Sequence, residues 1–268
     1  MNSMFTVIKE QLSSFYLIRR LSLFELKSAN NSHYLGMLWE IINPMIQIGI
    51  YWFVFGYGIR NGRSVNGVPY FYWLLGGISV WFFVSPAFME ASKSIYTRIA
   101  LISKMSFPMS VIPSYVIFSK FYQHLLLLSI IIVIFQFTGY PISIYYLQIP
   151  YFMVATIMLV IAVSLITSTL AVIVRDVQMI VQAIVRMLLY LTPILWTPEK
   201  LQQVIHNIMK LNPLYYITEG YRAALFGHNW YFLVHLKYSM YFWGVVLVLF
   251  FIGSILHLKF RNQFVDYL

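Results

Sequence analysis

The residues that could carry out acid, base or metal chemistry are few and scattered in this sequence. The eight carboxylates are Glu10, Glu25, Glu40, Glu90, Asp176, Glu199, Glu219 and Asp266. The six histidines are dispersed in the same way, and neither a His-Glu-x-x-His motif nor a Gly-x-x-x-x-Gly-Lys-Ser/Thr loop occurs. The absence of cysteine excludes thiolate catalysis, disulfides and Cys-ligated metals. We therefore expect no metal site and no catalytic activity of the chain by itself.

Three ionisable residues lie inside long apolar runs, where an unpaired charge costs at least about 2.5 kcal/mol near a bilayer centre. They are Glu40, Lys120 and Arg186. Glu40 could pair with either cation, or Glu40 and Lys120 could reach the lipid headgroups by snorkelling. Arg186 lies near the middle of its run, and a guanidinium facing a cavity can hold a phosphate through two hydrogen bonds. We expect Arg186 to line a pathway for an anionic substrate.

Aromatic residues make up 19% of the chain and crowd one part of it. Tyr51, Trp52, Phe53, Phe55 and Tyr57 follow one another closely near the end of the first apolar run. Such rings are typical of the belt at a membrane interface. On a stripe facing a pathway, they would also offer surfaces for stacking sugars or sliding lipids. Both uses remain open at this point.

The elements that must position these residues are membrane-spanning helices. Hydrophobic residues make up 60% of the chain and charged residues only 10%, against about 25% charged in soluble domains. Ranges 65–89 and 149–174 contain no formal charge, and a spanning helix needs roughly 20 mainly apolar residues. We predict an all-α, multi-pass membrane protein with six crossings. The predicted crossings are 36–59, 68–89, 108–137, 149–174, 178–196 and 240–258.

Lysines and arginines predict the orientation of the chain. Ten of them fall in the N-terminal segment, the second and fourth connections and the C-terminal tail, against six in the other connections. By the positive-inside rule, both termini are cytoplasmic, in a protein of the cell membrane. The formal charge of +10 then reflects basic loops at an anionic lipid surface. Nucleic acid is not an expected partner, because the basic residues form no cluster.

Residues 1–35 are predicted to form a separate N-terminal segment ahead of a six-crossing transmembrane domain over 36–268. Phe5, Ile8, Leu12 and Phe15 recur at helical spacing, with Glu10 on the opposite side. This pattern predicts a helix lying in the membrane interface. The charges in this segment leave no uninterrupted apolar run of the kind that a cleavable signal peptide has.

Range 92–107, between the second and third crossings, mixes basic with apolar residues and predicts a cytoplasmic amphipathic helix. Such a helix can dock into a groove on a partner protein or lie on the membrane surface, and the pattern does not separate the two. The residues assigned to partner contact are Ile95, Tyr96, Arg98, Ile99 and Lys104.

Range 197–227, in the longest connection, predicts two short helices. Thr197-Pro198 and Asn212-Pro213 are both typical helix starts, and Gly227 is a stop signal. The apolar faces of these helices either dip back into the outer leaflet or pack on the surface of the bundle. The residues assigned to these external helices are Glu199, Tyr215, Glu219 and Arg222.

Four stretches, in this order, resemble the membrane permeases of type 2 ABC exporters of cell-surface polysaccharides. They are 21–55, LISKMSFP at 101–108, the pair at 175–176 with LTPILW at 191–196, and NPLYY at 212–216 with EGYR at 219–222. Together with the six-crossing layout they cover nearly the whole chain, and their order and spacing make the resemblance specific. Within that family, the chain looks most like the teichoic-acid translocation permeases of Gram-positive bacteria.

The resemblance implies a half-transporter that forms a homodimer and binds two copies of a separate ATP-hydrolysing subunit. That subunit would hold ATP and Mg²⁺, so no cofactor is expected in this chain. Range 92–107 would be the coupling helix, and 197–227 the external re-entrant helices. The implied cargo is a teichoic acid on a polyprenyl diphosphate, with another lipid-linked polysaccharide, such as O-antigen or capsule, as the alternative.

The predicted substrate pathway combines arginines with aromatic residues. Charge is sparse at 28–33, where many polysaccharide exporters place several basic residues, so the arginines elsewhere are the better candidates for the headgroup. The assigned pathway residues are Tyr51, Trp52, Phe55, Arg60, Arg63, Arg186 and Trp196. The lipid tail would remain in the bilayer through a lateral opening between the first and fifth crossings.

Overall fold

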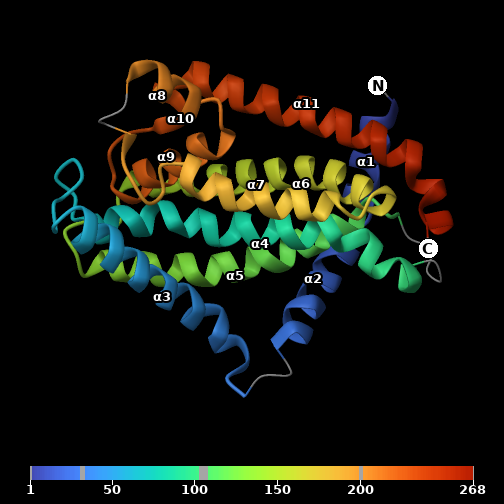
Figure 1. Cartoon of the computed structure of the whole chain (residues 1–268), viewed down its shortest axis with the longest axis horizontal. Helices are drawn as coiled ribbons and strands as arrows, with labels where there is room; N and C mark the ends of the chain where they lie inside the picture. The colour runs from blue at the N-terminus through green and yellow to red at the C-terminus, as the bar shows by residue number, and fades with distance from the viewer. Residues whose placement is uncertain (1, 31–33, 103–107, 199–201, 268) are drawn as a thin grey trace.

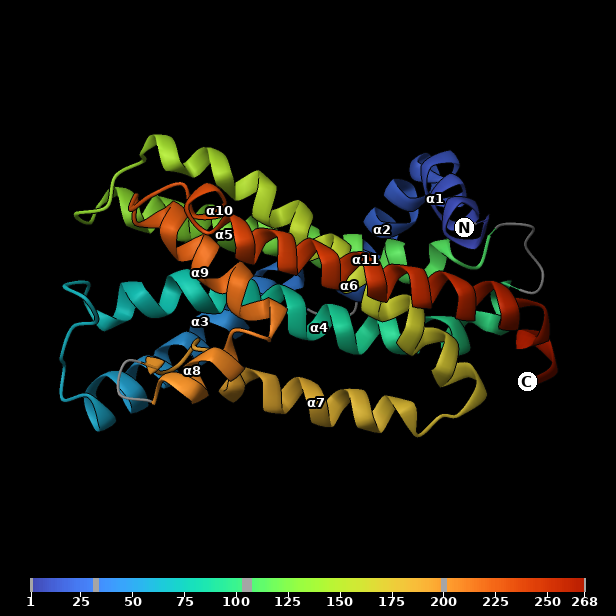
Figure 2. The ribbon, with the colours of Figure 1, turned by 90° about the horizontal axis from the view of Figure 1, so that it is seen from above.

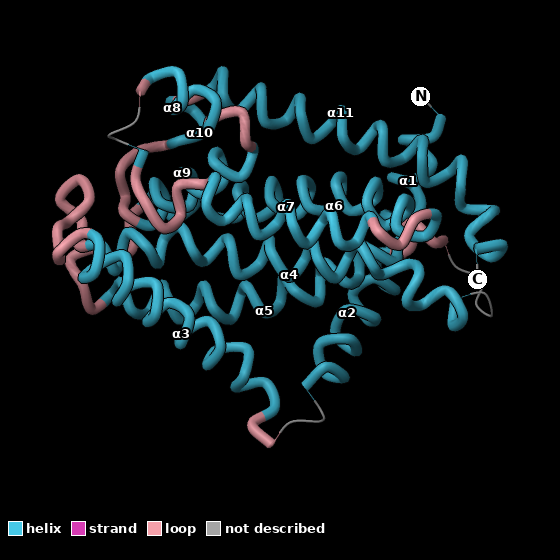
Figure 3. Tube along the Cα trace, in the orientation of Figure 1, coloured by secondary structure: helices cyan, strands magenta, loops and turns pink. Residues whose placement is uncertain are grey.

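The computed structural model describes residues 2–30, 34–102, 108–198 and 202–267. Within these ranges, the chain is helical and forms no β-strand, as Figure 3 shows. This result confirms the all-α prediction. An all-helical chain suits a bilayer, because a helix satisfies its backbone hydrogen bonds internally.

Five helical segments in the described ranges are long and apolar enough to cross a membrane. They are η1 (Gly36–Leu38) with α3 (Trp39–Tyr51) and the π-helical η2 (Trp52–Ile59), α4 (Tyr70–Ile102), α5 (Val111–Gln136), η3 (Ile144–Gln148) with α6 (Ile149–Ile173), and α11 (Leu236–Phe260) with η5 (Arg261–Tyr267). The fifth predicted crossing corresponds to α7 (Val177–Leu191), which has 15 residues. Its length of about 22 Å is short of a bilayer core of about 30 Å, so six crossings stay a prediction.

Helix α4 lies at the centre of the bundle. It packs against α5, α6 and α7, and α11 packs along α6 (Figures 1 and 2). Most of the apolar stretch of α4 is buried, whereas α3 is half-buried or exposed along its length and fully buries only Ile48. The central helix must therefore be apolar all round, and the outer helices present their exposed faces to lipid or to another chain.

Helix α4 also contains the segment predicted as a separate amphipathic helix. Residues 92–102 continue α4 without a break, and 103–107 lie outside the described residues. The continuation has a physical cause, because Ala87, Ala91 and Ile95 are fully buried at a spacing of four and extend the packed face of α4. No Gly or Pro interrupts the helix after Pro86.

The N-terminal segment forms two helices, α1 (Asn2–Ser13) and α2 (Phe15–Asn30), where the sequence predicted one. Helix α2 buries Ile18, Ser22 and Leu26 along one face, and the serine in that face obscures the amphipathic pattern. Figure 1 shows α2 and α3 leaving the bundle and converging in a V.

Both chain termini lie at one end of the bundle, and α8 lies at the other (Figure 1). These are called the termini end and the α8 end. At the termini end, the Glu10 carboxylate binds the guanidinium of Arg261 at 2.9 Å and accepts a hydrogen bond from Ser110. Helix α1 is thereby joined to the start of α5 and to the end of α11. That the termini end is cytoplasmic stays a prediction.

The connection before α11 contains α8 (Gln203–Met209), α9 (Pro213–Leu225) and a short α10 (Tyr231–Val234) that was not predicted. The predicted start of α9 is confirmed, since Asn212 Oδ1 accepts from the Leu214 amide at 3.0 Å and Pro213 is the first helical residue. Gly227 has a φ of +67° and follows the end of α9, as predicted. Helix α8 starts at Gln203, while Pro198, the predicted start, is 3-10 helical and 199–201 lie outside the described residues.

Helix α9 runs back into the bundle. The Tyr221 hydroxyl lies 3.1 Å from Nε2 of His124, and His124 lies midway along α5. Gly220 permits this approach, because a Cβ at that position would lie 2.2 Å from the Phe152 ring of α6. A non-spanning helix therefore reaches the middle of the helical bundle from the α8 end.

Candidate functional site

A cavity of about 350 Å³ opens at the α8 end, between the end of η2 and the segment after α7. We call it the arginine cavity. Its lining residues are Phe55, Ile59, Arg60, Asn61, Arg63, Ser64, Leu195, Trp196 and Thr197. The structure thus brings together four of the seven predicted pathway residues, from segments more than 130 positions apart.

Arg60 is the best-placed group in the arginine cavity for binding an anion. Its Nη2 donates to the Thr197 hydroxyl at 2.7 Å, and its guanidinium lies 5.6 Å from the ring centre of Tyr70. Its Nη1 is buried and has no hydrogen-bond partner among the residues that the structure describes. A buried donor without a partner is costly, and a phosphate or carboxylate oxygen would satisfy it. Arg63 is exposed and adds a second positive charge to the lining.

Arg222 fixes one wall of the arginine cavity from behind. Its side chain is 3% exposed, and Nη1 donates both to the Glu219 carboxylate and to the Pro193 carbonyl at 2.6 Å. The guanidinium lies 3.6 Å from the centre of the Trp73 ring. Gly77 permits this position, because a Cβ there would lie 2.3 Å from Nη2. Burial lowers the pKa of Arg222 and the Glu219 charge raises it, so the guanidinium stays charged.

Tyr70 and Asn212 hold the same wall, residues 192–197. The Tyr70 hydroxyl donates to the Leu195 carbonyl at 2.7 Å, and Asn212 Nδ2 donates to the Thr192 hydroxyl at 2.8 Å. Side chains from α4 and from the start of α9 therefore position Trp196 and Thr197 opposite Arg60. The sequence placed Arg222 among external helix residues, and its role as an internal clamp carried no sequence signal.

The other predicted pathway residues lie elsewhere. Trp52 packs its ring against Phe71 at 5.5 Å, so it joins η2 to α4. Tyr51 precedes it in α3, half-buried. Arg186 lies on the exposed side of α7, where its Nε donates to the Gln182 carbonyl at 3.2 Å.

Of the residues assigned to partner contact, Ile95 is placed differently from the prediction. Ile95 is fully buried in a small core at the termini end, so its side chain is not on a docking surface. Arg98 pairs with Glu25 of α2, and Tyr96 is half-buried. The Ile99 side chain and Lys104 lie outside the described residues. The burial of Ile95 follows from its place on the packed stripe of α4.

Of the residues assigned to the external helices, Tyr215 and Glu219 lie on α9. The Tyr215 hydroxyl lies 2.9 Å from Nε2 of His206 and so joins α9 to α8. Burial, with the Glu219 charge, raises the pKa of Tyr215 to about 12, so its phenol keeps the proton at neutral pH. Glu199 lies outside the described residues.

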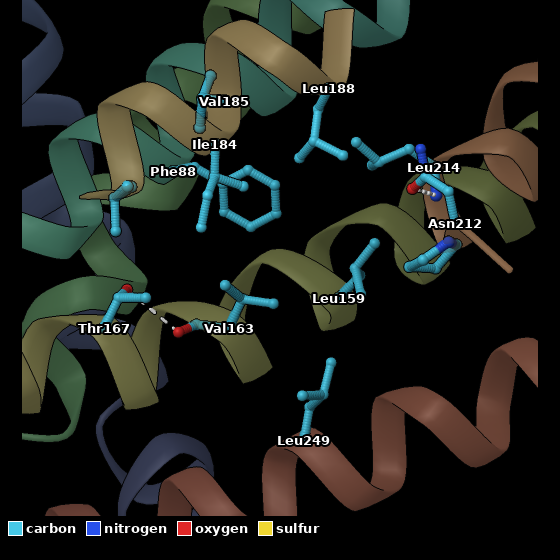
Figure 4. A pocket seen from close by; sticks show the side chains of 12 residues that line it. Phe88, Leu159, Val163, Thr167, Ile184, Val185, Leu188, Asn212, Leu214 and Leu249 are labelled. Carbon is cyan, nitrogen blue, oxygen red and sulfur yellow. Dashed lines mark hydrogen bonds between the residues drawn. The ribbon is translucent and has the colours of Figure 1, made fainter. Parts of the chain in front are cut away.

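A second cavity, of about 240 Å³, is almost entirely apolar (Figure 4). It lies between α7 and α6 and is closed by Phe88, Leu214 and Leu249. Its polar side chains already have partners, since Thr167 donates to the Val163 carbonyl at 3.1 Å and Asn212 caps α9. Such a cavity can hold an apolar chain and performs no chemistry. The sequence gave no sign of it, because ordinary apolar residues from five helices form it.

Glu40 and Lys120 line a third cavity, of about 370 Å³, between α3, α4 and α5. The sequence left open an ion pair of Glu40 with Lys120 or Arg186. Among the described residues, neither pair lies within 4.0 Å. In the same ranges, no three His, Asp or Glu residues are grouped closely enough to hold a metal ion.

Comparison with known proteins gives a family and two similar relatives. The family model described as ABC-2 type transporter matches residues 16–226. An O-antigen export system permease protein RfbA of Klebsiella pneumoniae is 26% identical over 247 residues, covering 91% of this chain and 92% of the relative. The protein of the same name in Myxococcus xanthus is 24% identical over 207 residues, covering 76% and 78%. The matched family region contains the arginine cavity and the whole of α9.

Proposed function

The chain belongs to the ABC-2 type transporter family as a multi-pass membrane permease, and we propose that it exports a lipid-linked polysaccharide with energy from a separate ATP-binding subunit. The observation that carries the proposal is the similarity to O-antigen export permeases over 91% of the chain. These relatives favour an O-antigen-like polysaccharide over the teichoic acid that the sequence suggested. The arginine cavity supports an anionic group, such as the diphosphate of a lipid carrier, in the cargo.

A separate subunit that hydrolyses ATP is proposed from the residues of this chain. The sequence contains no phosphate-binding loop, so the permease must receive its power from another subunit. We propose that two copies of that subunit bind at the termini end. There Lys93 and Thr97, on the accessible side of α4, flank the buried Ile95.

A homodimer is proposed from the position of Arg186. It lies in the middle of α7 beside the exposed apolar residues Ile184, Met187 and Tyr190. A guanidinium facing lipid there would cost at least about 2.5 kcal/mol, so this face of α7 requires a wet or protein-covered environment. A second copy with a water-containing path between the two chains supplies both.

The polar and apolar cavities suit the two parts of such a cargo. A hydrated glycan cannot cross hydrocarbon, so we propose that it passes between the two copies and leaves past Arg60 and Arg63. The apolar cavity beside α7 would hold part of the lipid tail, which need not leave the bilayer. Residues 192–197, which Arg222 holds in place, connect α7 with the arginine cavity. A movement of α7 would therefore be passed on to the arginine cavity through these residues.

The test is transport by the full chain in vesicles, together with the ATP-binding subunit that co-purifies with it. A lipid-linked O-antigen-type glycan is placed inside, and its appearance outside is measured with an impermeant glycosidase. We expect exposure that requires ATP and stops with a non-hydrolysable analogue. A parallel assay with lipid-linked teichoic acid tests the other cargo. Transport driven by an ion gradient without ATP would contradict the proposal.

A further inference from the structure

Another cavity, of about 260 Å³, opens between α9, the connection from α9 to α11 and the segment before α4. We call it the Glu219 cavity. It lies at the α8 end, where Figure 1 shows α9 and α10. Segment 60–68 lines two cavities in succession, with 60–64 at the arginine cavity and 65–68 at the Glu219 cavity. The two cavities are therefore neighbours, although they share no lining residue.

One wall of the Glu219 cavity is an ion pair whose two charges compensate each other. Every nitrogen of the Arg222 guanidinium already donates, to Glu219 and to the carbonyls of Trp73, Pro193 and Ile194. A phosphate in the cavity would find no free nitrogen on Arg222 and would be repelled by Glu219. An ammonium would be attracted by Glu219 but repelled by the guanidinium beside it. The pair therefore favours a ligand without net charge.

Two hydrogen-bond acceptors of the cavity are free. Arg222 bonds one carboxylate oxygen of Glu219 at 2.6 Å, and no other described residue donates to the second oxygen. The Glu219 side chain is 30% exposed, which leaves this oxygen accessible. The Oδ1 of Asn229 is buried and, in the same ranges, has no partner. Because a buried acceptor without a partner is unfavourable, a ligand that donates hydrogen bonds would stabilise the site.

Tyr231 adds a hydroxyl that can both donate and accept. Within the described part of the chain, the hydrogen bond that Tyr231 makes is that of its backbone amide to Gln148. Burial raises the pKa of Tyr231, and the Glu219 charge raises it further, so the phenol keeps its proton at neutral pH. Tyr231 and Phe226 are half-buried in the lining, and such rings offer apolar faces beside the polar groups.

We propose that the Glu219 cavity binds a neutral sugar unit of the exported glycan. Sugar hydroxyls donate to Glu219 and Asn229 and accept from Tyr231, and the apolar face of the sugar ring packs on Phe226. The inference rests on the proposed function and assigns recognition of the glycan, rather than of its lipid carrier, to α9. The first sugar of a lipid-linked glycan is bonded to the diphosphate, so a diphosphate at Arg60 brings that sugar towards the neighbouring cavity.

The first test measures binding of free sugars to the purified full-length chain. The probes are the methyl glycosides of glucose, galactose, mannose, rhamnose and N-acetylglucosamine, with methylammonium and methyl phosphate as charged comparisons. The chain is held in phospholipid nanodiscs, because many detergents carry a sugar head group, and binding is measured by saturation-transfer NMR. We expect at least one glycoside to bind and neither charged probe to displace it.

Substitution of Asn229 gives the sharpest variant. Asn229→Ala removes an acceptor that no described residue uses, so thermal unfolding should be unchanged. Sugar binding should weaken roughly fivefold, the effect of one neutral hydrogen bond. Asn207→Ala, at an exposed position of α8 outside the cavity, is the matched control and should bind as the wild type does. Equal affinity of the wild type and Asn229→Ala would overturn the inference, as would displacement by either charged probe.

The binding assay separates this inference from the proposed function, because it requires neither ATP nor transport. ATP-dependent export by a chain that binds none of the glycosides would overturn the inference alone. Sugar binding by a chain that exports no glycan would overturn the proposed function.

A second test uses the whole lipid-linked glycan in the transport vesicles. A photoreactive benzoylphenylalanine replaces His228, which is exposed and lines the cavity, or Leu233 of α10, which is 55% exposed and lies outside it. We expect glycan adducts from position 228 during ATP hydrolysis and few from position 233, measured as a shift on a gel that a glycosidase reverses. Equal yields at the two positions, or none at 228, would refute the site.

Discussion

Three arginines have different roles because their surroundings differ. Arg222 is buried and bound on several sides, so it acts as a clamp. Arg60 is held by Thr197, but within the described ranges one of its donors has no partner, so it can still receive a ligand. Arg186 lies exposed on an apolar helix, where a guanidinium facing lipid would be unfavourable.

Substitution of Gly77 tests the clamp. Gly77→Ala would place a methyl group 2.3 Å from Arg222 Nη2 and force the guanidinium away from Pro193. We expect a loss of about 1–3 kcal/mol in stability, the usual range for overpacking, measured as a lower midpoint of thermal unfolding in detergent. Gly49→Ala is the control, because a Cβ there meets no atom within 4 Å. Equal midpoints for the two variants would argue against the clamp.

Substitution of Arg60 tests anion binding in the arginine cavity. Arg60→Gln removes the charge and the free donor, whereas Arg60→Lys keeps the charge. We expect roughly tenfold weaker stimulation of the transporter's ATP hydrolysis by lipid-linked substrate in Arg60→Gln, with partial recovery in Arg60→Lys. Arg20→Gln, at an exposed position of α2, serves as the control. A response of Arg60→Gln equal to that control would exclude the role.

Residue types alone predicted part of the arginine cavity. Phe55, Arg60, Arg63 and Trp196 stood out as aromatic or basic residues next to apolar runs, and the fold brings them together. The clamp by Arg222 was not predictable, because it depends on a glycine in α4 and on carbonyls after α7. Likewise, nothing local distinguishes the buried Ile95 from the exposed apolar residues of an amphipathic helix.

At the scale of elements, α3 and α7 differ from the central helices in how little they bury. Exposed apolar residues run along both, among them Ile46 and Ile50 in α3 and Met179 and Met187 in α7. Periodicity located these helices, since a run of apolar residues shows where a spanning helix lies. It left open which faces meet lipid and which meet protein, because both environments accept the same side chains.

A single cysteine on α7 tests the proposed dimer. The sequence contains no cysteine, so each introduced thiol is the only one. Met187→Cys on α7 should form a disulfide-linked dimer in native membranes after mild oxidation. Val248→Cys on α11 has the same exposure, 58%, and should form little. The measurement is the dimer band on a non-reducing gel, and equal bands for the two variants would contradict an α7 interface.

At the scale of the whole molecule, the helical bundle contains separate cavities, and the sequence contains no nucleotide-binding motif. Apolar patterning predicted the all-helical class, and cap residues predicted α9. The return of α9 into the bundle, however, rests on contacts between distant residues such as His124 and Tyr221. Patterns within one helix carry no record of such contacts, so this part of the architecture required the structure.

Dependence on a partner gives a prediction for the complete complex. The purified chain alone should hydrolyse ATP no faster than a mock preparation. Hydrolysis should appear when the co-purified ATP-binding subunit is present and should rise with lipid-linked substrate. Phosphate release is the measurement. Turnover by the permease after removal of the partner would contradict this division of labour.

The contact between Glu10 and Arg261 constrains the order of events during biogenesis. The ribosome makes the acid first and the base some 250 residues later, after every long helix has been translated. The contact between α1 and Arg261 can therefore form only after α11 has been synthesised. In a nascent chain truncated before residue 261, α1 should therefore be more accessible to protease. Formation of the Glu10–Arg261 contact would then mark a late step of folding.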